Sequence, residues 1–377
     1  MKNFKVKHYV SYIGVGVFAL IFTVLTFTTG LPQSTLYLLE KIAISIILAV
    51  SLSLVVGFLG ELSLGHAGFM CIGAYLGGKM SLILEAAMGR GSVAALLLSM
   101  VVGGLAAAIC GFVIGLPALR LKGDYLAIVT LAFGEIVRSV FQNSSDKSFG
   151  GALGLATPRF NKNYLFIIAF IMVLVTLAVV QNLMRSKHGR AITAIRDNEI
   201  AARATGVNVT KYKLLAFIIS ACFAGIAGVL FSYSQTKVQS STFDFNYSID
   251  ILVMVVLGGM GSINGSVLAA ALISYLNVEL SSVLTGDKAV LQNLFYALIL
   301  IVIVIYNNAP ALKGLREKFN IKNLSGKLFK HETDPAYRND DTAKWDKVPT
   351  KIAMDELISV DTSPDKTFKP DSPKKER

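Results

Sequence analysis

The sequence predicts an all-α polytopic membrane protein of about ten transmembrane helices, some of them broken at glycine-rich segments. Of its 377 residues, 54% are hydrophobic and 16% are charged, whereas about a quarter of a soluble domain is charged. The mean hydropathy of +0.60 excludes an ordinary soluble enzyme and a disordered chain. Runs of about 20 apolar residues, the length that crosses a bilayer core, recur along the chain. These runs are 10–29, 36–56, 67–84, 93–116, 125–142, 163–183, 213–234, 249–276 and 290–306.

The first apolar run follows three lysines, as a secretory signal does, but it is too long and has no small-residue cleavage site. We therefore expect an uncleaved first span. Lys and Arg are retained on the cytoplasmic side of a membrane. The N-terminus, Arg120 with Lys122, and the basic stretch 185–213 all fall on that side if the N-terminus is cytoplasmic and the spans alternate.

The chain divides near Asn307 into a membrane domain, 1–306, and a hydrophilic tail, 307–377. The tail holds 15 basic and 12 acidic residues, and we expect it to be disordered and cytoplasmic. Nine crossings would place the tail outside, and a tenth crossing is the simplest way to keep its basic first residues on the cytoplasmic side. The apolar stretch 249–284 is long enough to hide one, because G-G-M-G-S-I-N-G interrupts it at 258–265, and 57–66 is a second place. Broken helices are where transporters often bind cargo.

Ionisable groups in or beside a span need a partner, a cavity or an interface. Glu135 and Arg138, three residues apart on one helical face, are expected to pair. His66 is interpreted as a packed, hydrogen-bonded histidine, and Asp124 and Asp250 as helix caps. The cysteines have no metal-ligand spacing, and no phosphate-binding loop is present. No metal, cofactor, nucleic-acid partner or ATPase activity of the chain itself is therefore expected.

The stretch 185–213 is too long and regular for a simple connection. It predicts two short helices, 191–196 and 199–205, punctuated by Gly189 and Gly206. Asp197 or Asn198 can cap the second helix, and Gly206 can end it in the left-handed conformation. Its apolar residues could dock in a groove of a soluble partner or lie on anionic lipid, and composition alone leaves both open. These apolar residues are Ile195, Ile200, Ala202 and Val207.

Small residues recur four apart inside the predicted spans, which is typical of close packing between membrane helices. The pairs are Gly73 with Gly77, Gly111 with Gly115, Ala221 with Gly225, Ala224 with Gly228, and Gly261 with Gly265.

Four segments together resemble the membrane subunits of branched-chain amino acid ABC importers, and in particular the larger, M-type permease. The resemblance covers about residues 35–306. The segments are G-E-L-S-L-G-H-A-G-F at 60–69, L-K-G-D-Y-L-A-I-V-T-L-A-F-G-E-I at 121–136, G-R-A-I-T-A-I-R-D-N-E-I-A-A at 189–202 and V-L-G-G-M-G-S-I-N-G at 256–265.

This resemblance implies a second permease subunit as heterodimer partner, two ATP-binding cassette subunits, an extracytoplasmic solute-binding protein, and a place in the bacterial plasma membrane. The loop would be an ATPase-coupling loop, a variant of E-A-A-x-x-x-G in which Ile200 is inserted. Its expected coupling residues are Gly189, Arg190, Arg196, Asp197, Glu199, Ala201, Ala202 and Gly206. One departure is Phe149, where the family commonly has Thr, and the tail is outside the family pattern.

The function expected on this basis is import of leucine, isoleucine and valine by alternating access. A urea or small-amide importer of the same superfamily and an ion-coupled secondary transporter remain alternatives. We expect the substrate path at the two glycine-rich breaks and at three residues of the span 125–142. The candidate path residues are Ser63, Gly65, His66 and Gly68 at the first break, Gly258, Gly259 and Gly261 at the second, and Tyr125, Thr130 and Phe133.

Overall fold

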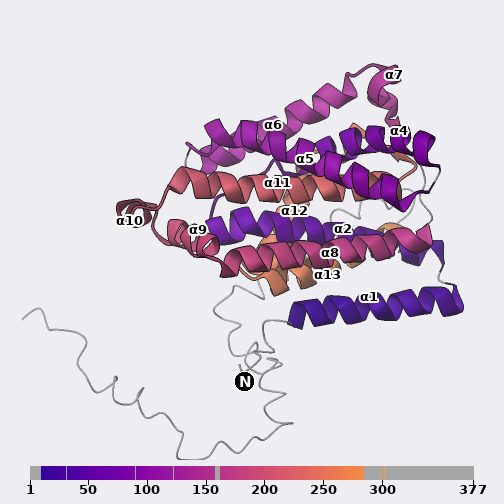
Figure 1. Cartoon of the computed structure of the whole chain (residues 1–377), viewed down its shortest axis with the longest axis horizontal. Helices are drawn as coiled ribbons and strands as arrows, with labels where there is room; N and C mark the ends of the chain where they lie inside the picture. Colours follow the sequence, from indigo (N-terminus) through magenta and orange to yellow (C-terminus); the bar gives the residue numbers. More distant parts are fainter. Residues whose placement is uncertain are drawn as a thin grey trace, which may run out of the picture. The chain divides into compact units, whose positions relative to one another are not determined.

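The computed structural model describes residues 10–30, 32–89, 91–121, 123–157 and 162–283, with Leu298 and Ile301, and this part of the chain is almost entirely helical (Figure 1). The predicted all-α class is confirmed there. The predicted run at 290–306, apart from those two residues, and the tail lie outside the described residues. The elements are α1 Val10–Thr29, α2 Gln33–Ser53, η2 Leu54–Leu59, α3 His66–Ile72, η3 Gly73–Gly77, α4 Gly78–Met88, α5 Val93–Ala118, α6 Asp124–Gln142, α7 Asp146–Phe149, η4 Gly151–Leu153, β1 Leu155–Ala156, α8 Lys162–Arg185, α9 Lys187–Asp197, α10 Glu199–Ala204, α11 Val209–Ser234, β2 Lys237–Val238, η5 Ser240–Thr242, α12 Phe245–Leu257 and α13 Ile263–Val283.

Within the described ranges, six helical stretches are long and apolar enough to cross a membrane. They coincide with runs predicted from the sequence, while α1 and α6 fill the predicted runs 10–29 and 125–142. The number of ten crossings stays a prediction. The six stretches are Gln33–Leu59, His66–Met88, Val93–Ala118, Tyr164–Arg185, Val209–Ser234 and Ile263–Ser281.

The predicted break in the stretch 249–284 is confirmed, because α12 ends at Leu257 and α13 begins at Ile263. At about 1.5 Å per residue, the 13 residues of α12 extend roughly 20 Å, which is less than the thickness of a bilayer core. The stretch 60–65 is also non-helical and joins η2 to α3, so it holds no additional crossing. Both glycine-rich breaks predicted from the sequence are therefore interruptions of helices.

Helix α11 is the element around which α5, α2, α3 and η3 pack (Figure 1). Small residues allow this close approach, as predicted. A Cβ added to Gly111 of α5 would stand only 2.7 Å from the Cβ of Ala221, and Gly73 lies directly on the backbone of Gly225. Such contacts are typical of membrane helices, which lack a hydrophobic drive to associate in lipid.

Two predicted helix caps are wrong. Asp124 is the first residue of α6, with Gly123 at the capping position and no capping hydrogen bond from a side chain. Asp250 lies inside α12, because that helix begins five residues before it. The residue that caps α12 is Asp244, whose carboxylate accepts the N–H of Tyr247 at 2.9 Å.

Figure 1 shows α9 and α10 at one end of the long helices and α7 at the other. Near α7, β1 and β2 pair antiparallel, with Leu155 opposite Val238. The ring of Tyr75 stacks on Phe141 with centroids 4.3 Å apart, and Phe149 packs edge-on against Phe141 at 5.3 Å. Phe149 thus completes an aromatic cluster with Tyr75 and Phe141.

Candidate functional site

The loop between α8 and α11 folds into two short helices, as predicted. The hydroxyl of Ser186 accepts the backbone N–H of His188 at 3.1 Å and starts α9. The side-chain oxygen of Asn198 accepts the N–H of Ala201 at 3.0 Å and starts α10. Of the two residues that could cap the second helix, Asn198 is therefore the one that does.

Two glycines were expected to punctuate this loop, and only one of them does. Gly206 follows α10 with a φ of +85°, which confirms the predicted left-handed conformation. Gly189 is instead inside α9, because the cap at Ser186 starts that helix earlier than predicted. It is buried against the backbone of Met184 at the end of α8, where a side chain would not fit.

The predicted apolar surface of the loop faces mostly inward. Ile195 and Ala202 are only 4% and 5% exposed, in a cluster with residues of η2, α9 and α11, and Val207 packs against it. Ile200 is the exception at 79% exposed. The loop is therefore anchored on the bundle by its own apolar residues, and Ile200 on α10 is left for contact with a partner or with lipid.

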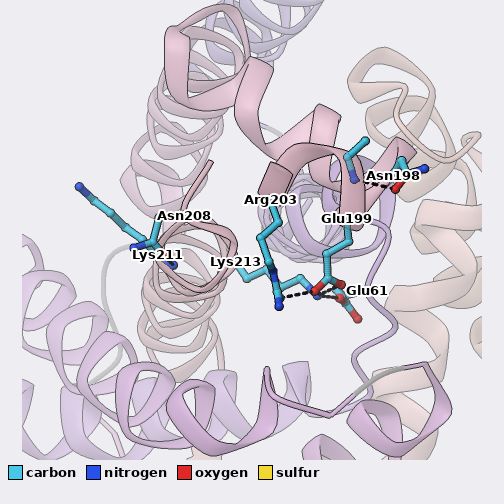
Figure 2. A network of polar contacts seen from close by, with 8 residues as sticks. Glu61, Asn198, Glu199, Arg203, Asn208, Lys211 and Lys213 are labelled. Atoms are coloured by element: carbon cyan, nitrogen blue, oxygen red, sulfur yellow. Dashed lines mark hydrogen bonds and ion pairs between the residues drawn. The ribbon is translucent and has the colours of Figure 1, made fainter. Parts of the chain in front are cut away.

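A network of charges ties α10 to the bundle (Figure 2). The ammonium of Lys213, on the first turns of α11, donates both to the carboxylate of Glu61 and to that of Glu199, the latter at 3.2 Å. Arg203 approaches the other oxygen of Glu199 at 2.9 Å. The Lys213 side chain is 5% exposed and Glu61 13%, so this network is largely withdrawn from solvent.

The remaining predicted coupling residues lie on both sides of the loop. Arg190, Asp197 and Ala201 are exposed, while Arg196 pairs with Asp197 at 3.1 Å and also reaches back to the bundle. Gly189 and Ala202 are buried. The loop therefore presents an outer face and an inner face, and the eight residues are divided between them.

The first glycine-rich break is held by α6. The backbone N–H of Leu64 donates to the hydroxyl of Thr130 at 3.0 Å, and this hydroxyl donates to carbonyls of its own helix. Gly65 packs directly on the Thr130 backbone, and Gly68 lies against Gly134. Gly65, Gly68 and Thr130 are therefore brought together, and Ser63 is buried in the same segment as Gly65.

His66 is buried, and its ring nitrogen lies 2.9 Å from the hydroxyl of Ser51. This contact supports the interpretation as a packed, hydrogen-bonded histidine. The next residue, Ala67, donates its N–H to the hydroxyl of Ser248 on α12 at 3.1 Å. The start of α3 is thus fixed to α2 on one side and to α12 on the other.

The other candidate path residues are distributed between three places. Phe133 is nearly buried and its ring packs on Phe69 of α3, with centroids 4.9 Å apart, close to the first break. Tyr125 is 70% exposed near the start of α6 and is not brought together with the rest. Gly258, Gly259 and Gly261 form the turn between α12 and α13, where Gly261 lies beside Gly57 of η2.

The predicted pair of Glu135 and Arg138 is confirmed, with two guanidinium nitrogens within 2.8 Å of one carboxylate oxygen. Sequence reasoning missed the partnership of Lys213 with Glu61. Glu61 lies beside a predicted span, where a charge requires a partner, and Lys213 is the last of the basic residues in the stretch 185–213. A charged residue at a span needs a partner of opposite charge, and this requirement is the signal that could have indicated the pair of Lys213 and Glu61.

A family model described as branched-chain amino acid transport system / permease component matches residues 34–305. The chain is 39% identical over 262 residues to the high-affinity branched-chain amino acid transport system permease protein LivM of Salmonella typhimurium, covering 61% of this chain and 60% of that protein. It is 35% identical over 316 residues to the protein of the same name from Escherichia coli, covering 75% and 71%.

More distant similarity extends to a ribose import permease of Escherichia coli, 28% identical over 192 residues, which are 48% of this chain and 56% of that protein. The chain spans 60% and 71% of the lengths of the two branched-chain amino acid relatives. No solved structure matches the chain.

Proposed function

The chain belongs to the family of branched-chain amino acid transport system permease components, and we propose that it is the membrane subunit of an ATP-driven importer of leucine, isoleucine and valine. It is a multi-pass membrane protein, and we propose that it lies in the plasma membrane of a bacterium. The N-terminus and the tail are cytoplasmic in this proposal, as the distribution of basic residues favours.

The proposed assembly contains a second permease subunit, two ATP-binding cassette subunits beneath the pair, and an extracytoplasmic protein that delivers the amino acid. This chain lacks a phosphate-binding loop motif, so ATP hydrolysis is assigned to the partners. The names of the two relatives describe a permease protein of a transport system, which supports this division of labour.

The observation that carries the proposal is the link between α10 and the first helix break. Glu199 on α10 and Glu61 in the 60–65 segment share the ammonium of Lys213 (Figure 2). A displacement of α10 therefore acts, through one ion-pair network, on the segment that leads into α3. The exposed Ile200 on the same helix supports contact between α10 and an ATPase subunit.

In the proposed mechanism, binding of ATP closes the two ATPase subunits and moves α9 and α10. A ligand shifts a conformational equilibrium only by its differential affinity for the two states. ATP must therefore favour one position of the loop. The ion-pair network must then couple this position of the loop to one of the two gate states of the bundle. Cargo selection would rest mainly with the binding protein.

Reconstitution tests the whole proposal. Vesicles containing this chain, its permease partner, the two ATPase subunits and the binding protein should accumulate labelled leucine only when ATP is supplied on the ATPase side. Isoleucine and valine should compete, whereas urea and ribose should not. Uptake by this chain alone under an ion gradient, without any ATPase subunit, would contradict the proposal and favour a secondary transporter.

Two variants test the loop. Glu199→Lys replaces a partner of Lys213 by a like charge, and Gly206→Trp forces a bulky residue into the left-handed conformation. Each should lower ATP-driven uptake while the chain still inserts in the membrane. Lys211→Ala, at an exposed position two residues before Lys213, is the matched control; it leaves the carboxylates around Lys213 in place and should lower uptake less than Glu199→Lys. Wild-type uptake in both loop variants would refute the coupling role.

A further inference from the structure

One side chain of α9 is directed from the loop into the bundle. The Nη1 atom of Arg196 donates to the carbonyl oxygen of Gly57 at 3.2 Å, while its Nε and Nη2 lie 3.2 and 3.1 Å from one carboxylate oxygen of Asp197. A planar guanidinium can serve both acceptors at once because its five donors form a rigid fork. Gly57 belongs to η2, at the end of the span that begins with α2.

Glycines make room for this side chain at both helix breaks. A Cβ added to Gly60 would stand 2.8 Å from the Cγ of Arg196, and one added to Gly261 would stand 3.3 Å from its Nη1. The breaks also touch each other, because a Cβ on Gly57 would lie 2.7 Å from the nitrogen of Gly261. Arg196 therefore contacts the two breaks at the point where they meet.

The charge of Arg196 suits this position. Both η2, which ends at Leu59, and α12, which ends at Leu257, finish at this meeting point. The last carbonyls of a helix lack intrahelical partners, and this end carries a partial negative charge. Two such helix ends repel each other when they are close, and a cation beside both of them offsets this repulsion.

We propose that Arg196 is a positioning residue that holds the two helix breaks against each other, so that movement of α9 acts on both breaks together. This inference rests on the proposed coupling role of the loop and deepens it. Arg196 then acts inside the permease, between the loop and the path, while the outer face of the loop is left to the ATPase. Within the described part of the chain, the Lys213 network contacts the first break through Glu61, whereas Arg196 contacts both breaks.

Hydrogen–deuterium exchange on the assembled complex tests the contact without any need for cargo. Arg196→Ala should raise backbone exchange in two segments, 54–62 and 257–263, although about 200 residues separate them in the chain. Lys187→Ala removes an exposed cation from the first turn of the same helix and should change neither segment. Exchange that rises in one segment alone, or in neither, would overturn the proposal.

Transport coupling provides the second readout. In Arg196→Ala, the leucine transported per ATP hydrolysed should fall about tenfold, a size typical of coupling between two sites. A general structural defect would instead lower uptake and hydrolysis in proportion, and that outcome would contradict a positioning role. Arg196→Lys keeps the charge and one donor, so it should recover part of the coupling, whereas the neutral Arg196→Gln should recover less.

The two tests separate this inference from the proposed function. If the unmodified complex takes up no branched-chain amino acid with ATP, the proposed function fails, and the exchange experiment still reports on Arg196. If the unmodified complex transports leucine but Arg196→Ala leaves both exchange and coupling unchanged, the inference fails and the proposed function stands.

Discussion

Lys213 and Glu61 form an ion pair although 152 residues separate them in the chain, and their side chains are only 5% and 13% exposed. The pair joins the first turns of α11 to the non-helical segment before α3. Since the same ammonium also binds Glu199 of α10, three segments depend on one lysine. Removal of one member of such a buried group leaves the others uncompensated.

Lys213→Met should therefore destabilise the protein by about 3 kcal/mol, because two carboxylates lose their shared cation. Arg203→Ala, which removes a 68% exposed partner of Glu199, should cost less than about 1 kcal/mol. Thermal unfolding of the two variants in detergent measures the difference. Adding Glu61→Gln to Lys213→Met should recover part of the loss, and equal effects of Lys213→Met and Arg203→Ala would argue against a buried network.

Thr130→Val should destabilise the first break. Valine keeps the shape of the side chain but leaves the N–H of Leu64 without its acceptor, which costs about 1–2 kcal/mol. Thr176→Val is the matched control, because the buried Thr176 hydroxyl donates to Met172 of its own helix. Denaturant or thermal unfolding should show the larger loss at position 130, and Thr130→Ser should restore stability. If both valine variants lose equally, the bond to Leu64 contributes nothing.

Gly261→Ala and Gly259→Ala separate backbone strain from the contact with Arg196. Both glycines have positive φ, +85° and +89°, so alanine is strained at each. The new methyl group would meet Arg196 at 3.3 Å in the first variant, but only Ser262, at 3.9 Å, in the second. Leucine uptake should therefore fall further in Gly261→Ala at equal amounts of inserted protein. Identical losses would mean that strain alone acts in this turn.

Phe149→Thr should loosen the aromatic cluster near α7. Loss of the ring removes contacts with Phe141 and Tyr75 and should cost about 1–3 kcal/mol. Leu153→Thr, at a position 65% exposed in the neighbouring η4, should change stability by less than about 0.5 kcal/mol. Thermal unfolding checks both variants, and an unchanged Phe149→Thr protein would show that the cluster is dispensable.

The elements that sequence predicted well are those set by local physics. Apolar runs indicated the positions of the helices, and the glycine-rich stretch 258–265 indicated the end of α12. The left-handed conformation of Gly206 was predicted from its place after a short helix. Each of these depends on residues within a few positions of one another. Helix starts were less accurate, since Asp124 and Asp250 could each cap a helix, but Gly123 and Asp244 hold those positions.

The inner face of the candidate site could not be predicted in this way. Composition marks Ile195 and Ala202 as apolar residues of the loop, but it cannot say whether a partner or the chain's own bundle covers them. The sequence places Lys213 at the end of the basic stretch 185–213 and at the start of the predicted span 213–234, but it does not indicate Glu61 as its partner. These assignments depend on packing between segments far apart in sequence.

Several close contacts between segments of this bundle are formed by pairs of glycines, which have only a hydrogen atom as side chain. Gly57 lies on Gly261, Gly68 on Gly134 and Gly73 on Gly225, each pair backbone against backbone. Every substitution at such a position adds volume, and none can remove any, so each one forces the paired segments apart. These glycines therefore mark where the segments meet, and they carry no information about the transported molecule.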